Sequence, residues 1–127
     1  MGASQRRKGA AAERELAKIL ADELGERVCR NLEQVHSGGC DLLGLAPFAI
    51  EVKRCETLAL PAWWRQACEQ AQGAVPVLAY RRSRQPWRFR LPLPYVQAGD
   101  WGALDPVCEV DLFGFCWLAR EVVADVD

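Results

Sequence analysis

Residues 37–53 read SGGCDLLGLAPFAIEVK, two apolar runs that charged residues interrupt. The runs are typical of short β-strands, and Ala46-Pro47 separates them. Because alternate side chains of a strand share one face, Glu51 and Lys53 should project together, away from the apolar residues between them. Asp41 ends the polar stretch before the first run. The segment therefore predicts two carboxylates and one amine at adjoining strand ends.

These three groups suit the hydrolysis of a phosphodiester. Mg²⁺ prefers oxygen ligands and is usually held by one or two carboxylates together with water and substrate phosphate. Asp41 and Glu51 can supply the carboxylates. Lys53 would orient or deprotonate an attacking water, or offset the charge that develops on the phosphate. A surface hairpin with an ordinary Glu/Lys pair would give the same letters, so the segment alone leaves both interpretations open.

Length and composition indicate one domain spanning residues 1–127. The chain has 127 residues, half of them apolar, which suffices for one core. No apolar run reaches membrane-spanning length, and no apolar segment follows the basic N-terminus, so we expect a cytoplasmic protein. If its phosphodiester substrate is DNA, the protein would be associated with DNA there, in the host cytoplasm if a phage encodes it. The six cysteines form no C-x-x-C pair and there is one histidine, which argues against a zinc finger and favours reduced, mostly buried thiols.

Charge is distributed unevenly along the chain. Residues 1–90 hold 15 Lys and Arg against 10 Asp and Glu, whereas residues 91–127 hold 1 against 7. A basic body suits a polyanion binder whose acidic C-terminal part, about 92–127, faces elsewhere. Alternatively, the acidic residues only maintain solubility.

The expected elements alternate between helices and strands. Apolar spacing predicts a helix over residues 5–24 that Gly25 ends, and Pro61 favours the start of a second helix that reaches residue 71. Between them, the Gly38-Gly39 pair either brings backbone N–H groups close to a phosphate or forms a flexible turn. Further strands are expected at residues 27–31, 76–81, 87–91, 107–111 and 113–120.

Five arginines are concentrated in the hairpin predicted over residues 76–91. They alternate with aromatic residues and have no acidic neighbours in the local sequence, which favours a surface that contacts DNA phosphates. Protection of a sheet edge by charge is the alternative. The five are Arg81, Arg82, Arg84, Arg88 and Arg90.

Several segments, in collinear order over about residues 6–91, resemble archaeal-type Holliday junction resolvases of the PD-(D/E)-x-K nuclease superfamily. They are RKGAAAEREL at 7–16, Ser37 ahead of Asp41-Leu42, IEVK at 50–53, and VPVLA at 75–79 followed by WRF at 87–89. The resemblance implies an α/β, restriction-endonuclease-like αβββαβ core, with a central mixed sheet flanked by helices and with C-terminal strands beyond it. It also implies a homodimer that makes paired, Mg²⁺-dependent cuts in four-way DNA junctions, with Mn²⁺ substituting.

The resemblance also assigns roles by position. Glu13, which helix spacing alone favours as a surface residue, matches the glutamate that completes the family's site and would join Asp41 and Glu51 as a metal ligand. Lys53 matches the catalytic lysine, and Ser37 a functional serine in the loop. Basic positions suited to DNA contacts are Arg7, Lys8, Arg14 and Arg30.

Three departures from the family pattern stand out. Cys40 replaces the proline of the superfamily's name, a change that leaves the metal site intact. Trp63-Trp64 has no clear counterpart in archaeal resolvases, which leaves the dimer interface and the junction specificity open, and the acidic region from Asp100 onward differs from a uniformly basic resolvase. Gln66 or Gln70 could correspond to a polar position on the second helix of many superfamily members. A nicking or flap nuclease of the same fold and a non-catalytic DNA-binding module remain alternatives.

Overall fold

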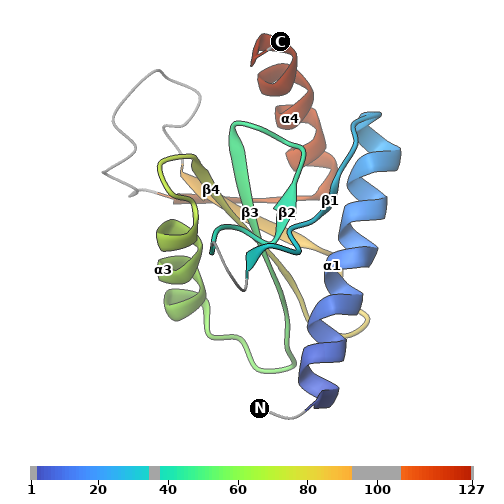
Figure 1. Cartoon of the computed structure of the whole chain (residues 1–127), viewed down its shortest axis with the longest axis vertical. Helices are drawn as coiled ribbons and strands as arrows, with labels where there is room; N and C mark the ends of the chain where they lie inside the picture. Colours follow the sequence, from blue (N-terminus) through green and yellow to red (C-terminus); the bar gives the residue numbers. More distant parts are fainter. Residues whose placement is uncertain (1–2, 35–37, 93–106, 127) are drawn as a thin grey trace.

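A six-stranded mixed sheet forms the centre of the molecule (Figure 1). The computed structural model describes residues 3–34, 38–92 and 107–126. The strands lie in the order β1 to β6, with β3 and β4 parallel and all other neighbours antiparallel. Along the chain the elements are α1 (Ala3–Leu24), β1 (Cys29–Arg30), β2 (Leu42–Leu43), β3 (Phe48–Arg54), α3 (Leu60–Gln70), β4 (Val75–Arg81), β5 (Arg88–Pro92), β6 (Val107–Asp111) and α4 (Leu112–Val126). The expected αβββαβ core is confirmed.

Helices cover both faces of the sheet, so the domain has three layers (Figure 1). The main apolar core joins Leu16 and Leu20 of α1, Phe115 of α4, and the side chains of β3, β4 and β5 that face these helices. On the opposite face Leu78 and Tyr80 of β4 pack against α3. Burial of apolar surface on both faces stabilises the sheet and fixes which side chains of each strand point outward.

The register of β3 against β4 separates the polar from the apolar side chains of β3. Glu51 lies opposite Leu78 and Lys53 lies opposite Tyr80, so both charged residues are on the face that α3 covers. Ile50 and the other apolar residues that alternate with them along β3 belong to the main core on the other face. The predicted alternation along this strand is therefore confirmed.

The C-terminal part differs from the expected pair of strands. Residues 107–111 form β6, but residues 113–120 belong to the helix α4. Phe115 and Ala119, four positions apart, pack into the core, while Phe113 and Trp117 are exposed. Asp111 Oδ1 accepts a hydrogen bond from the N–H of Gly114 at 2.8 Å, which caps the new helix. The sequence of this run favoured a strand because aromatic and apolar residues surround the few positions that follow helical spacing. The helical period is therefore hard to recognise.

The thiols are less buried than expected. All six cysteines are present as thiols, but only Cys116 is buried, and Cys29 is exposed. Four others are partly exposed, which contradicts the expectation of mostly buried thiols. Within the described parts of the chain, no helix combines the length and apolar character needed to cross a membrane.

Candidate active site

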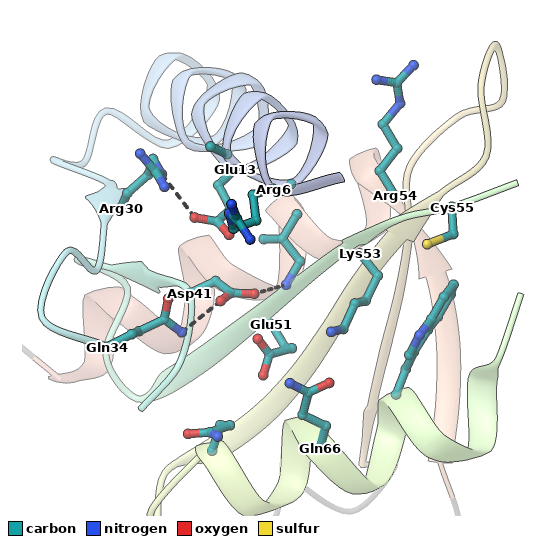
Figure 2. Close-up of a pocket in the computed structure, with 15 residues that line it drawn as sticks. Arg6, Glu13, Arg30, Gln34, Asp41, Glu51, Lys53, Arg54, Cys55 and Gln66 are labelled. Atoms are coloured by element: carbon teal, nitrogen blue, oxygen red, sulfur yellow. Dashed lines mark hydrogen bonds and ion pairs between the residues drawn. The ribbon is translucent and has the colours of Figure 1, made fainter. Parts of the chain in front are cut away.

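Asp41 is fixed by the strands on either side of it. Its N–H donates to the carbonyl of Ile50 at 2.9 Å, and its own carbonyl accepts from the N–H of Asn31 at 2.8 Å. Its buried carboxylate accepts one bond at each oxygen: the N–H of Val52 donates to Oδ2 and Nε2 of Gln34 donates to Oδ1, both at 2.7 Å (Figure 2). The carboxylate therefore has one fixed orientation.

Glu51 is buried beside Asp41, but its carboxylate lacks hydrogen-bond donors like those that hold the carboxylate of Asp41. Its side chain is 3% exposed, and Oε2 has no hydrogen-bond partner. Burial, followed by hydrogen bonding to Asp41 and repulsion from its charge, raises the pKa of Glu51 to about 9. A buried carboxylate oxygen without a partner is rare and costly. Two adjacent carboxylates, one of them unsatisfied, fit a divalent cation, which would satisfy the oxygen and offset the repulsion.

Asp41, Glu51 and Lys53 open into a cavity of about 620 Å³ between α1, β3 and α3. Figure 2 shows Lys53 and Gln66 on the α3 side of Glu51, and Arg6, Glu13 and Arg30 on the α1 side. The remaining lining residues are Gly9, Ala10, Gln34, Val52, Arg54, Cys55, Trp63 and Gln70.

Glu13 is held by Arg30 within this cavity. Arg30 Nε donates to Glu13 Oε1 at 2.9 Å, and both side chains are largely buried. Burial raises the pKa of Glu13, and the hydrogen bond from Arg30 opposes this shift. Among the described residues, no three His, Cys, Asp or Glu side chains are grouped closely enough to hold one metal ion. Asp41 and Glu51 thus form the candidate metal pair, and Glu13 as a third ligand stays a prediction.

The glycine turn before Asp41 uses its N–H groups inside the protein. Gly39 N–H donates to Gln70 Oε1 and Gly38 N–H donates to the carbonyl of Gln34, each at 2.9 Å. Both glycines have positive φ, 69° and 97°, which side chains rarely tolerate. Of the two alternatives for this pair, the internal bonds favour a turn over N–H groups that approach a phosphate. Ser37, the predicted loop serine, lies outside the described residues.

The arginine hairpin has acidic partners that its local sequence lacks. Glu109 of β6 pairs with Arg88 at 3.1 Å and Arg90 at 3.3 Å, and Glu15 of α1 pairs with Arg81 at 3.0 Å. The acidic C-terminal part therefore contacts the hairpin, contrary to the expectation that it faces elsewhere. The other predicted DNA-contacting residues are exposed, namely Arg7, Lys8 and Arg14 on α1 and Arg82 and Arg84 in the hairpin turn.

Sequence reasoning missed Arg6, Gln34 and Arg54 as residues of the cavity. Arg6 precedes Glu13 by seven positions, two helical turns, and this spacing could have placed it on the same face of α1. Gln34 has helical backbone in the connection between β1 and β2, a segment too short for apolar spacing to indicate where its side chain points. Both tryptophans of α3 are partly buried, and Trp63 packs against Tyr80 with ring centroids 6.3 Å apart.

A buried Asp before β2 and Glu-x-Lys on β3 of a mixed α/β sheet define the PD-(D/E)-x-K class of nucleases. Residues 4–99 match the family model described as phage putative PDDEXK endonuclease. The chain belongs to this family, and it is a nuclease of this type. Such nucleases generally use divalent metal ions.

The fold also has a solved counterpart. Hjc, a Holliday junction resolvase from the archaeal hyperthermophile Archaeoglobus fulgidus, superimposes with a TM-score of 0.51 and 23% sequence identity. The match covers 92% of this chain and 96% of that one. At this identity the likeness shows the fold, which confirms the restriction-endonuclease-like architecture. No curated protein sequence matches significantly.

Proposed function

We propose that the chain is a Mg²⁺-dependent, structure-selective DNA endonuclease that resolves Holliday junctions by paired cuts as a homodimer in the DNA-containing cytoplasm. The observation that carries this proposal is the buried pair of Asp41 and Glu51, with one unpartnered oxygen, beside Lys53 in an open cavity. The structural counterpart is a Holliday junction resolvase, which supports the choice of substrate.

In this mechanism the chain's own residues orient the reactants for hydrolysis. Asp41 and Glu51 would hold the ion, which when bound activates water and offsets charge on the phosphate. Lys53, on the same strand face as Glu51, orients the water or offsets the charge that develops on the non-bridging oxygens. The oxygen of water forms a bond to phosphorus as the bond to the 3′-oxygen breaks. The attacking water gives up a proton and the departing 3′-oxygen takes one from solvent, which leaves a 5′-phosphate and a 3′-hydroxyl.

Paired cuts require two such sites. A four-way junction has two strands related by a two-fold axis, so a C₂ dimer would present one site to each. Light scattering during the assay checks this assembly. A monomer that still makes paired cuts would contradict the dimer.

The decisive experiment compares DNA structures of matched sequence. The protein is incubated with Mg²⁺ and labelled four-way, flap, duplex or single-stranded DNA, and the cuts are mapped. We expect symmetric cuts in the four-way junction. Preferred cutting of flaps would favour a flap nuclease, and salt-dependent binding without cleavage under any divalent ion would indicate a non-catalytic module.

Variants test the assigned residues in the same assay. Asp41→Ala, Glu51→Ala and Lys53→Ala should each lower cleavage by at least about 100-fold, because each removes a group that acts on the reacting phosphate. Junction binding measured without divalent ions should persist. Glu69→Ala, an exposed residue of α3 outside the cavity, is the matched control. Undiminished cleavage by all three variants would reject the assignment.

A further inference from the structure

One amide side chain connects the candidate metal pair to the glycine turn. Gln34 Nε2 donates to Asp41 Oδ1 at 2.7 Å and to the carbonyl of Gly39 at 3.0 Å. A side-chain amide nitrogen has two N–H donors, so both are used. We propose that Gln34 is a positioning residue that fixes the carboxylate of Asp41 for cation binding. This inference rests on the proposed metal-dependent function.

The orientation of Asp41 depends on two donors, of which only one is part of the sheet. The N–H of Val52 belongs to β3 and holds Oδ2. A single hydrogen bond would leave the carboxylate able to rotate about its χ2 torsion, which is broad for Asp. The bond from Gln34 to Oδ1 removes that freedom.

The turn to which Gln34 is attached is itself held from two other directions. Gln70 of α3 accepts from the N–H of Gly39 at 2.9 Å, so the N–H and the carbonyl of Gly39 are each bound by a glutamine. Asn31 Nδ2 donates to the carbonyl of Cys40 at 2.9 Å. Gln34 is therefore anchored on fixed backbone by one N–H, and its other N–H holds Asp41, so that binding an ion costs little entropy.

Donors behind a ligating carboxylate have a known effect on metal sites. Removal of such a partner typically weakens metal affinity or activity by about 10- to 100-fold. Gln34 touches no scissile group in this arrangement, so its effect should appear as cation affinity and not as affinity for DNA.

The test uses Gln34→Met, which keeps the length of the side chain but removes both donors. Calorimetric titration of the full-length protein with Mn²⁺ should give a Kd raised by about 10- to 100-fold. Cleavage at low Mg²⁺ should fall by a similar factor and recover at high Mg²⁺, while KM for DNA stays within twofold.

Two further variants separate positioning of Asp41 from general order of the turn. Gln72→Met is the matched control, because Gln72 is exposed beside the same turn and lines a neighbouring cavity of about 310 Å³ instead. It should bind Mn²⁺ as the unchanged protein does. Gln70→Met breaks the other bond of Gly39 and should weaken binding less than Gln34→Met.

The outcomes distinguish this inference from the proposed function. An unchanged protein that neither binds Mn²⁺ nor cuts DNA would refute the proposed function. If the unchanged protein binds Mn²⁺ and cuts DNA, two results would overturn the inference alone. One is a Kd for Mn²⁺ of Gln34→Met within twofold of that of the unchanged protein. The other is a loss of Mn²⁺ affinity in Gln70→Met equal to that in Gln34→Met. Gln34→Met could also melt at a clearly lower temperature than the unchanged protein. In that case Gln34→Asn replaces it, because this variant keeps the amide but is too short to reach Asp41. Gln34→Asn must then show the same loss of Mn²⁺ affinity.

Discussion

At the residue scale, the burial of Glu51 opposes folding whenever its carboxylate is ionised. Burial and the neighbouring Asp41 raise the pKa of Glu51 from its ordinary 4.5 to about 9. Between these values the folded chain holds a proton that the unfolded chain has released. The contribution of this group to stability is therefore complete below about pH 4.5 and is lost as the pH rises towards 9.

Glu51→Gln should remove this pH dependence. In buffer with a chelator, we expect the melting temperature of the unchanged protein to fall from pH 5 to pH 9 more steeply than that of the variant. At pH 8 the variant should be the more stable of the two, because its amide carries no charge. Calorimetry at several pH values measures this, with the exposed Glu69→Gln as control. Parallel curves for Glu51→Gln and the unchanged protein would contradict the account.

The site was predictable from sequence where its residues lie on regular elements. Strand alternation placed Glu51 and Lys53 on one face, and the resemblance added Glu13 from the first helix. Gln34 was not predictable, because the connection between β1 and β2 is too short to show periodicity and its contact with Asp41 depends on how this connection folds. The Gly38-Gly39 pair stayed open between two interpretations for a related reason: sequence reveals the positive φ that glycine permits, but not which acceptor its N–H finds.

At the element scale, α4 shows how a single cap can determine the state of an ambiguous segment. The run at 113–120 has the aromatic and apolar character of a strand, and β6 ends only one residue before α4 begins. Asp111 accepts a bond from the third N–H of the helix, that of Gly114. An Asp followed three positions later by Gly is common in turns as well, so the sequence alone did not indicate a helix start.

Asp111→Ala should destabilise α4 and with it the layer that packs on the main core. We expect a loss of about 1 kcal/mol in the free energy of unfolding, since an Ala at this position leaves the N–H of Gly114 without its acceptor. Denaturation in urea measures the change. Asp111→Asn retains a capping oxygen and should stay close to the unchanged protein. Equal stability of the Ala and unchanged proteins would show that the cap is dispensable.

At the scale of the whole molecule, the sheet places Arg88 and Arg90 of the hairpin and the active site on one face. The register sets Glu51 opposite Leu78 and Leu78 opposite Arg90 across three neighbouring strands. Neighbouring strands are about 4.8 Å apart, so the arginines lie roughly 10 Å from the strand that carries the site. Glu109, from the acidic C-terminal part, lies beside them on β6, opposite Arg90, and pairs with both arginines.

Glu109 should therefore limit the affinity of the hairpin for DNA. Hydrogen bonds from Tyr80, Arg88 and Arg90 outweigh the effect of burial and hold the pKa of Glu109 below its ordinary value, so its carboxylate is ionised at neutral pH. Glu109→Gln would remove the charge that neutralises Arg88 and Arg90. Each additional phosphate contact steepens the dependence of log K on log salt by about 0.9 for duplex DNA, so two released arginines should steepen it by about 2.

Fluorescence anisotropy with labelled duplex DNA, without divalent ions, measures this slope. Glu121→Gln, an exposed residue of α4, changes the net charge by the same amount and separates the local effect from the global one. If both variants bind alike, the hairpin does not contact DNA and its arginines serve the sheet edge. If only Glu109→Gln binds more tightly and with the steeper slope, the acidic C-terminal part regulates access to the basic surface beside the active site.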